Sequence, residues 1–348
     1  MSKIVFALDI GNKQTKIKNK NTEYILPSHF LNAENMGSNF GGTQETSNHE
    51  FKVPFSNEKF VWGETIDTLH LDTYMLDTLI RGNRYADESF KLLTNFAIGL
   101  LGKNYDEAKN GILDVYVVSG MPTKDYNEEA KRNSLHDVLK GQHQVEIDGE
   151  TYTIRVMDVY LVPQPIGTLY DELLGDDGLT IINDHLRTDK VGIIDIGGGT
   201  ILIDTILNFR LITGDSKQLN TGINDLYKSI ASNMDGEVSL YKLAKTLRAG
   251  NSDQEWVYQY SRNNMVNITE LVKRKIGTFT KQQINQINTT LDDLISIDTL
   301  LFTGGGSNLI DKKLIKESFV NAKFVSNSET TNVNGFYKFG LNYTSTDD

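Results

Sequence analysis

Three apolar runs along the chain each end at a glycine-containing turn. They are residues 4–10 before Gly11, residues 191–196 before Gly197, and residues 299–303 before Gly304. Short apolar runs that are bounded by glycine are typical of buried β-strands. We therefore expect three core strands, each of which leads the chain into a tight turn.

The segments between these runs predict a mixture of helices and further strands. Residues 15–18 and 23–27 indicate two short strands after the first turn, and residues 144–160 indicate a hairpin that turns at Asp148-Gly149. A helix is predicted by one apolar face, formed by Leu92, Leu93, Phe96, Ala97, Leu100 and Leu101. The pattern is that of an α/β protein.

One short motif occurs twice, about half the chain apart. Asp9-Ile10-Gly11 ends the first run, and Asp195-Ile196-Gly197 ends the second, each with a polar turn and an alternating strand behind it. Such a repeat indicates two related lobes that begin with the same strand–turn–strand unit.

Composition and charge narrow the class of protein. The 348 residues suggest about two domains, and no apolar run is long enough for a transmembrane helix or a signal peptide. Cysteine is absent, which excludes disulfides and thiolate metal sites, and the six histidines show no ligand spacing. The net charge of −11 disfavours direct nucleic acid binding, so a nucleic acid partner would be reached through a basic protein. We expect a cytoplasmic protein.

The three turns suit the binding of an anionic ligand. Glycine lets backbone N–H groups approach phosphate oxygens, and Lys16 could add a cation. Asp9 and Asp195 would hold Mg²⁺ through water, and the third turn could admit a base and ribose. Each turn alone is more often a simple loop, but the three together favour a nucleotide site. The sequence contains neither the P-loop pattern nor G-x-G-x-x-G.

These motifs, taken in order, resemble those of the actin-like ATPase superfamily. The matching segments are residues 9–16, 162–167, 195–200, 302–307 and 334–340. Within the superfamily the sequence is most similar to ParM-like plasmid-segregation actins, on its length, on residues 118–122 and on the ending Gly335-Phe336-Tyr337-Lys338-Phe339-Gly340.

The resemblance implies a fold of two ribonuclease-H-like lobes with a nucleotide cleft between them, each lobe built on a mixed five-stranded sheet. Lobe I would hold residues 1–163 and 331–348, with the first phosphate turn and a C-terminal helix. Lobe II would hold residues 164–330, with the second phosphate turn and the adenosine motif.

The resemblance also assigns roles to individual residues. Gln164 would orient the attacking water, and Asp9 and Asp195 would act with it in hydrolysis and hold Mg²⁺. Glu270, Lys273 and Arg274 have the spacing of a helix that clamps ribose and base, although a solvated helix face explains them equally well. The other residues expected to bind the nucleotide are Gly11, Asn12, Lys16, Gly197, Gly198, Gly199, Thr200, Gly222, Gly304, Gly305, Gly306 and Ser307.

The implied function is that of an ATPase that forms filaments. ATP, or GTP as the alternative nucleotide, would drive dynamic polymerisation with Mg²⁺, and the filament would segregate plasmid DNA through a basic DNA-binding adaptor protein at a plasmid centromere. No membrane partner is expected, since no amphipathic helix precedes Ile4. A small-molecule kinase or phosphohydrolase of the same superfamily is the alternative. A chaperone-type ATPase is disfavoured, because only eight residues follow Gly340.

Overall fold

The computed structural model describes residues 3–37, 47–69, 71–78, 82–250, 255–291 and 293–345, and the chain folds into two compact units. Unit 1 comprises residues 1–182 and 332–348, and unit 2 comprises residues 183–331. The chain therefore passes from one unit to the other twice.

Unit 1 is built on a single ten-stranded mixed sheet. The central strands β1, β8 and β10 are parallel, and antiparallel neighbours extend the sheet on both sides. In spatial order the strands are β3 (Glu23–Pro27), β2 (Gln14–Lys18), β1 (Val5–Ile10), β8 (Leu113–Met121), β10 (Glu150–Pro163), β9 (Gly141–Ile147), β5 (Asn48–Lys52), β6 (Lys59–Gly63), β4 (His29–Asn32) and β7 (Met75–Asp77).

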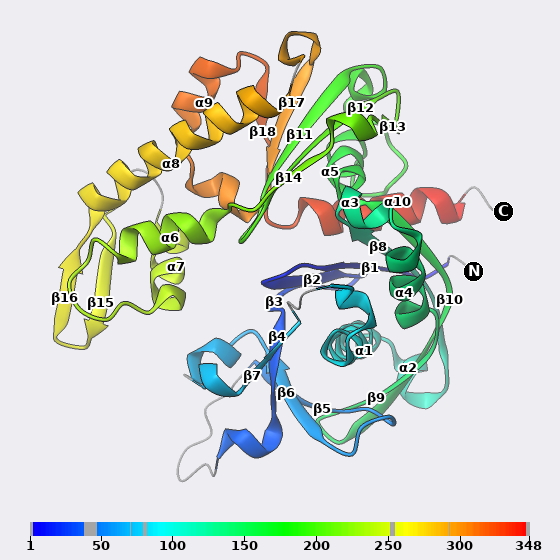
Figure 1. The fold of residues 1–348 in the computed structure, drawn as a ribbon. Coiled ribbons are helices and arrows are strands. Elements are labelled where there is room, and N and C mark those ends of the chain that lie inside the picture. Colours follow the sequence, from blue (N-terminus) through cyan, green and yellow to red (C-terminus); the bar gives the residue numbers. More distant parts are fainter. Residues whose placement is uncertain are drawn as a thin grey trace. The chain divides into compact units, whose positions relative to one another are not determined.

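This sheet curves around helix α1 (Glu88–Gly102), as Figure 1 shows. Asp87 caps the helix by accepting a hydrogen bond from the Ser89 backbone N–H, and apolar side chains cover most of the helix surface. Phe96 stacks on Phe51 and makes an edge contact with Phe30, which joins α1 to the outer strands. The other helices of the unit are α2 (Asp106–Asn110), α3 (Thr123–Tyr126), α4 (Glu129–Leu139), α5 (Gln164–Leu173) and most of α10 (Thr331–Ser345).

The expectation of a five-stranded sheet in each lobe is wrong: among the described residues, the sheet of unit 1 has ten strands and the sheet of unit 2 has six. The predicted hairpin of β9 and β10 is present and turns at Asp148-Gly149, but β9 also pairs with β5 along its other edge. This pairing adds β5, β6, β4 and β7 to the same sheet.

The boundary between the units follows α5 and does not lie at residue 163. Helix α5 packs closely against α10. The two backbones are so near at Gly335 that an added Cβ would lie 1.7 Å from the Gly167 carbonyl oxygen. Thr168 Oγ1 donates to Asn332 Oδ1 at 2.9 Å, and Lys338 Nζ lies 2.7 Å from Asp171 Oδ1. These contacts hold α5 in unit 1, whereas the sequence motifs suggested that the second lobe begins at Gln164.

Unit 2 has a six-stranded sheet in which β11 and β17 are parallel neighbours and β12 runs antiparallel to β11. Its strands are β13 (Arg210–Leu211), β12 (Ile201–Leu207), β11 (Lys190–Ile196), β17 (Thr299–Thr303) and β18 (Ala322–Phe324), with β14 (Lys217–Leu219) paired to β12. Its helices are α6 (Ile223–Ala231), α7 (Leu240–Ala249), α8 (Thr269–Thr290) and α9 (Lys312–Ser318). A separate hairpin consists of β15 (Val257–Ser261) and β16 (Asn264–Asn267).

Candidate functional site

The first predicted turn joins β1 to β2 in unit 1. Asp9 on β1 lies opposite Lys16 on β2, and the turn closes with a 3.0 Å hydrogen bond from the Gly11 N–H to the Gln14 carbonyl oxygen. A Cβ on Gly11 would lie 2.7 Å from that oxygen. The turn therefore requires glycine at its first position because of close packing.

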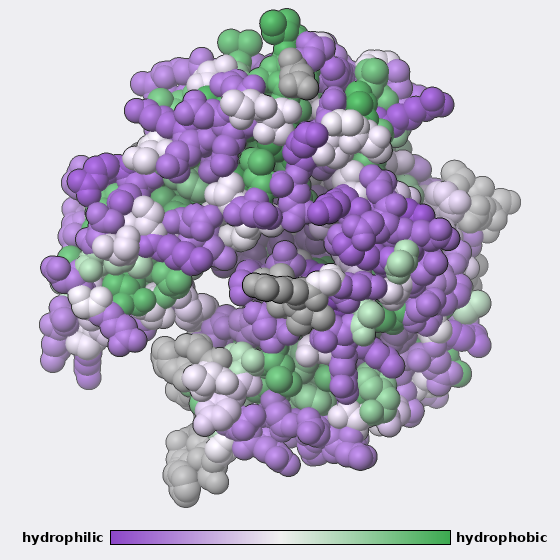
Figure 2. Space-filling model, viewed as in Figure 1, coloured by the Kyte–Doolittle hydropathy of each residue, from purple (hydrophilic) through white to green (hydrophobic). Residues whose placement is uncertain are grey.

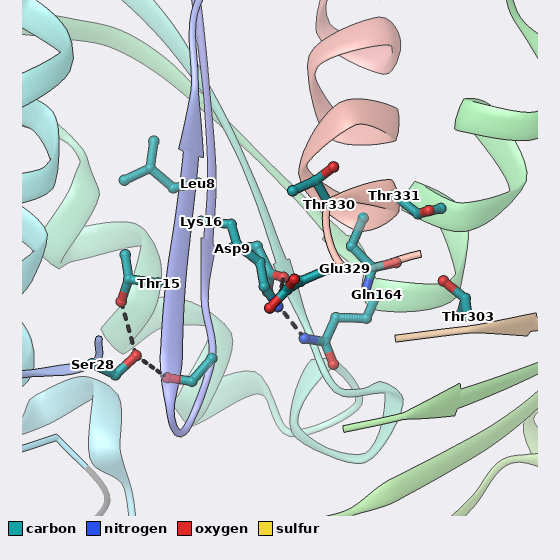
Figure 3. A network of polar contacts seen from close by, with 12 residues as sticks. Leu8, Asp9, Thr15, Lys16, Ser28, Gln164, Thr303, Glu329, Thr330 and Thr331 are labelled. Atoms are coloured by element: carbon teal, nitrogen blue, oxygen red, sulfur yellow. Dashed lines mark hydrogen bonds and ion pairs between the residues drawn. The ribbon is translucent and has the colours of Figure 1, made fainter. Parts of the chain in front are cut away.

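Asp9, Lys16 and Gln164 come together in unit 1 as the motifs predict. Asp9 is almost fully buried, its Oδ2 lies 3.6 Å from Lys16 Nζ, and its Oδ1 accepts a 3.3 Å hydrogen bond from Gln164 Nε2 (Figure 3). Gln164 begins α5 directly after β10, and β10 is parallel to β8, which is parallel to β1. The carboxyl ends of parallel strands share one edge of the sheet, which explains why residues 155 positions apart meet.

Arg84 is a residue at the first turn that sequence reasoning missed. Its Nη1 donates to Asn12 Oδ1 at 2.5 Å, and its Nη2 donates to the Gly11 carbonyl oxygen at 3.1 Å and to Thr78 Oγ1 at 3.2 Å. Burial lowers the pKa of the guanidinium from its usual value. No spacing or motif links Arg84 to the turn, because the contact is set by the short 3₁₀ segment Arg84–Ala86 before α1.

Ser28 supports the same turn and was also missed. Its hydroxyl donates to the Gly11 carbonyl oxygen at 2.8 Å and bonds Thr15 Oγ1 at 2.9 Å, a contact that Figure 3 shows. Ser28 and Thr15 are fully buried. A serine after a strand ending in Pro27 gives no signal of this role in the sequence.

The second predicted turn joins β11 to β12 in unit 2 and repeats the first. Asp195 pairs with Leu202 as Asp9 pairs with Lys16, and the Gly197 N–H donates to the Thr200 carbonyl oxygen at 2.9 Å. The strand–turn–strand repeat inferred from the sequence is thus present in both units with the same closing hydrogen bond.

The start of α6 is attached to this second turn through the backbone. The N–H groups of Ile223 and Asn224 donate to the carbonyl oxygens of Gly197 and Gly198 at 3.0 and 2.9 Å. A Cβ on Gly222 would lie 2.6 Å from the Gly198 carbonyl oxygen. The side chain of Asp225 accepts from the Gly222 N–H at 3.1 Å and completes the cap. Gly222 therefore lies beside the second turn, where the sequence analysis expected a further nucleotide-binding turn.

The third predicted turn packs against Asp195 and Ile196 at the end of β11, where the second turn begins. Gly304 has a φ of +81°, and a Cβ there would lie 2.2 Å from Asp195 Oδ1. A Cβ on Gly306 would lie 2.5 Å from Ile196 Cγ2. Ser307 is buried and donates to the Gly304 carbonyl oxygen at 2.8 Å, which fixes the turn. The three glycine segments of unit 2 thus converge around the end of β11, with Gly305 beside the Glu329 side chain.

Glu270, Lys273 and Arg274 lie on α8, but the structure divides them between two pockets. Glu270 and Lys273 are 3.6 Å apart and line a pocket of about 930 Å³ beside the β15–β16 hairpin. Arg274 lines a second pocket of about 420 Å³ together with Thr221 and Asp225, next to the Gly222 turn. Arg274 therefore shares a pocket with residues that flank Gly222.

Two family models match the sequence. One describes actin-like proteins, N-terminal domain, and matches residues 7–167; the other describes the archaeal actin homologue MreB-like, C-terminal, and matches residues 193–316. Together they cover the first turn, Gln164, the second turn and the third turn. This chain belongs to the actin-like proteins.

Solved structures agree with this membership. The crystal structure of apo psk41 ParM is 25% identical with a TM-score of 0.78, and the match covers 99% of each chain. An archaeal actin homologue in complex with ADP is 18% identical with a TM-score of 0.75 over 97% of this chain and 98% of its own. A 15-stranded ParM filament from Clostridium botulinum is 19% identical with a TM-score of 0.71 over 98% and 99%. No curated protein matches the sequence significantly.

Among the residues that the structure describes, no helix is both long and apolar enough to cross a bilayer. In the same residues, no three His, Cys, Asp or Glu side chains are grouped so that they could hold a metal ion by themselves.

Proposed function

We propose that this actin-like protein binds and hydrolyses ATP with Mg²⁺, and that the two Asp-Ile-Gly turns are its phosphate-binding elements. The observation that carries the proposal is the repeat of one turn geometry, in which each turn follows a strand that contains a carboxylate. The glycines of unit 2 fit the role, because a Cβ on Gly222, Gly304 or Gly306 would occupy the space around that turn. An archaeal homologue with ADP supports the choice of a nucleotide.

In unit 1 the side chains beside Asp9 suit phosphoryl transfer. Lys16 supplies a positive charge, and Asp9 would hold the cation, which neutralises phosphate oxygens when it is bound with ATP. Gln164 donates a hydrogen bond from its Nε2 to Asp9, so its Oε1 can accept a hydrogen bond from a water molecule. An amide orients a water more than it deprotonates it, and we assign Gln164 that role. Gly11 and Asn12 complete the proposed phosphate-binding turn.

In unit 2 the proposed ligands follow from the convergence of the three turns. Gly197, Gly198, Gly199 and Thr200 would bind phosphate through the backbone, and Asp195 would hold the cation. The pocket of Arg274, beside the Gly222 turn, is the place that we propose for the nucleoside. We also assign Gly304 to Ser307, which pack against the end of β11, to nucleoside binding. Glu270 and Lys273 line the neighbouring pocket, and we assign them to the ribose.

Replacement of Asp195 tests the assignment of the cation ligand. Asp195→Ala should abolish Mg²⁺-dependent ATP hydrolysis while the unfolding transition remains cooperative. Asp184→Ala removes an exposed carboxylate of the same unit and is the matched control, which should hydrolyse ATP like the parent protein. Phosphate release from both variants would be measured with ATP and GTP. Full activity of the Asp195→Ala variant would refute this assignment.

We further propose that ATP drives assembly of the protein into filaments. Structures of a ParM filament and of an Alp12 filament share the fold. A contact between two different surfaces of identical subunits does not close on itself and so extends into a filament. Sedimentation and negative-stain imaging with Mg-ATP, Mg-ADP and Mg-GTP would test this. Absence of polymer with every nucleotide across a range of salt would contradict the proposal.

Two exposed side chains of unit 2 are our candidates for contacts between copies. Ile295 and Val320 are almost completely exposed, and the Asn321 side chain bonds the Ile297 carbonyl oxygen at 2.6 Å, so the two apolar residues lie at the same end of the sheet. Apolar side chains also lie among hydrophilic ones at the end of unit 2 that carries the β15–β16 hairpin (Figure 2), where Met265 and Val266 are exposed. Ile295→Ser with Val320→Ser should raise the concentration needed for assembly, whereas Ile112→Ser in unit 1 should not.

The cellular role that we propose is plasmid DNA segregation in the cytoplasm through a basic DNA-binding adaptor protein. Its support is the likeness to the ParM protein and the net charge of −11, which favours a basic partner. Such a complex should weaken steeply as the salt concentration rises. If the protein instead transfers phosphate to a small molecule and never forms polymer, the kinase or phosphohydrolase alternative is favoured.

A further inference from the structure

Arg84 is a cationic side chain of unit 1 that the proposed roles above do not use. It donates three hydrogen bonds, and the three acceptors are neutral: Asn12 Oδ1, the Gly11 carbonyl oxygen and Thr78 Oγ1. Its Nε is buried without a hydrogen-bond partner, and its guanidinium lies 5.0 Å from the ring centre of Phe90. Burial of a guanidinium that has no carboxylate among these hydrogen-bond acceptors is unfavourable, although Asp125, Asp77 and Asp9 attract its charge without bonding it.

The bond to Asn12 fixes which end of that amide faces the guanidinium. Arginine can only donate hydrogen bonds, so the Asn12 oxygen must accept from it. The Asn12 Nδ2 group is then turned away from Arg84, and within the described part of the chain it donates to no acceptor. A free asparagine amide could present either end to a ligand, whereas this one presents only a donor.

We propose that Arg84 is a positioning residue that makes Asn12 a donor for the terminal phosphate of a bound nucleoside triphosphate. The inference rests on the proposed function, because it needs a nucleotide at the first turn. Arg84 also donates a hydrogen bond to the Gly11 carbonyl oxygen, which fixes the backbone of the turn at the same time. Arg84 should therefore help the protein to distinguish a triphosphate from a diphosphate. Loss of the ordered donor should weaken binding of the triphosphate more than binding of the diphosphate.

The test measures the ratio of affinities for a non-hydrolysable ATP analogue and for ADP, both with Mg²⁺, by calorimetry. Arg84→Met should lower the preference for the triphosphate about tenfold, which corresponds to about 1.4 kcal/mol, because the amide donor to the charged phosphate is no longer ordered. Asn12→Asp keeps an acceptor for Arg84 but replaces the donor with an oxygen, and it should lower the preference at least as much. Arg84→Lys should have an intermediate effect.

Two further variants separate positioning from a general structural role. Ser28→Ala loosens the same turn without touching Asn12, so it should weaken both nucleotides together and leave the ratio unchanged. Asn12→Ser replaces the amide with a hydroxyl that can donate without help from Arg84. Adding Arg84→Met to Asn12→Ser should therefore cause no further loss of the preference.

Each result decides between explanations. An unchanged ratio in both Arg84→Met and Asn12→Asp overturns the inference while nucleotide binding by the parent protein sustains the proposed function. An equal loss from Arg84→Met with and without Asn12→Ser also overturns it, because Arg84 would then act on the phosphate directly. A parent protein that binds neither nucleotide overturns both proposals. If Arg84→Met does not fold, the Asn12→Asp and Arg84→Lys ratios still decide the matter.

Discussion

The turn of unit 1 and the turn of unit 2 share a sequence motif and a closing hydrogen bond, but different groups support them. In the first turn the Gly11 carbonyl oxygen accepts from the side chains of Ser28 and Arg84. In the second turn the Gly197 and Gly198 carbonyl oxygens accept from the backbone N–H groups of Ile223 and Asn224 at the start of α6. One turn is therefore held by side chains and the other by a helix terminus.

This difference predicts where each turn tolerates substitution. A turn held by side chains loses one hydrogen bond when a supporting residue is changed, and its backbone can relax. A turn held by a helix terminus depends on the close approach of two backbones, which an added atom at the point of contact prevents. We expect the attachment of α6 to the second turn to be sensitive to replacement of Gly222, and the first turn, apart from its own Gly11, to be adjusted through the side chains around it.

The largest effect should come from Gly222→Ala. The new Cβ would lie 2.6 Å from the Gly198 carbonyl oxygen and 2.8 Å from the Gly197 carbonyl oxygen, so α6 would have to move away from the turn. Overpacking of this kind costs about 1–3 kcal/mol or more in the free energy of unfolding. Urea unfolding of the full chain would measure the loss.

Gly199→Ala is the matched control for this substitution. Gly199 lies in the same turn, but a Cβ there would meet no atom within 4 Å. We expect a change within about 0.5 kcal/mol. Equal losses from Gly199→Ala and Gly222→Ala would show that the contact with α6 is not what supports the second turn.

A smaller effect is expected from Ser28→Ala at the first turn. The substitution removes the hydroxyl that donates to the Gly11 carbonyl oxygen and leaves Thr15 Oγ1 buried without that partner, while Arg84 still bonds the carbonyl. The free energy of unfolding should fall by about 1–2 kcal/mol. Ser345→Ala removes an exposed hydroxyl that also donates to a carbonyl oxygen, and it should change the stability by less than about 0.5 kcal/mol.

Acid should affect the two units differently because of His143. This residue is buried in β9 of unit 1, with Nδ1 2.9 Å from Asn95 Oδ1 and Nε2 2.8 Å from the Leu139 carbonyl oxygen, and burial lowers the pKa of its ring. The unfolded chain then binds a proton at a higher pH than the folded chain does. This contribution to stability is present above the ordinary histidine pKa of about 6.5 and is lost as the pH falls below it.

Hydrogen exchange resolved by segment would check this at about pH 7 and about pH 5, after correction for intrinsic exchange rates. Amides of β9 should lose protection relative to those of β11 in unit 2. His143→Gln should remove the difference, whereas His185→Gln, at an exposed histidine of unit 2, should not. A parallel change in both strands would argue against His143 as the cause.

Those parts of the site that follow from local patterns could be predicted from the sequence. A strand that ends in Asp-Ile-Gly produces the same turn in both units, because the alternation, the glycine and the register are local properties. Arg84, Ser28 and the pairing of β5 with β9 could not be predicted in this way. Each depends on contacts between segments far apart in the chain, and the residues involved are common ones with no characteristic spacing.

The smallest effect should come from Lys13→Ala, which lies in the first turn between Asn12 and Gln14. Lys13 Nζ is 3.3 Å from Asp77 Oδ2, but both side chains are nearly half exposed, so water and salt screen the pair. Exposed pairs contribute about 0–1 kcal/mol, and we expect a loss near the lower end of that range. Lys13 and Arg84 are both cations at one turn, yet only Arg84 reaches the turn's own oxygens, at Gly11 and Asn12. A loss from Lys13→Ala as large as that from Ser28→Ala would mean that charge, and not the hydrogen bonds to those oxygens, supports the first turn.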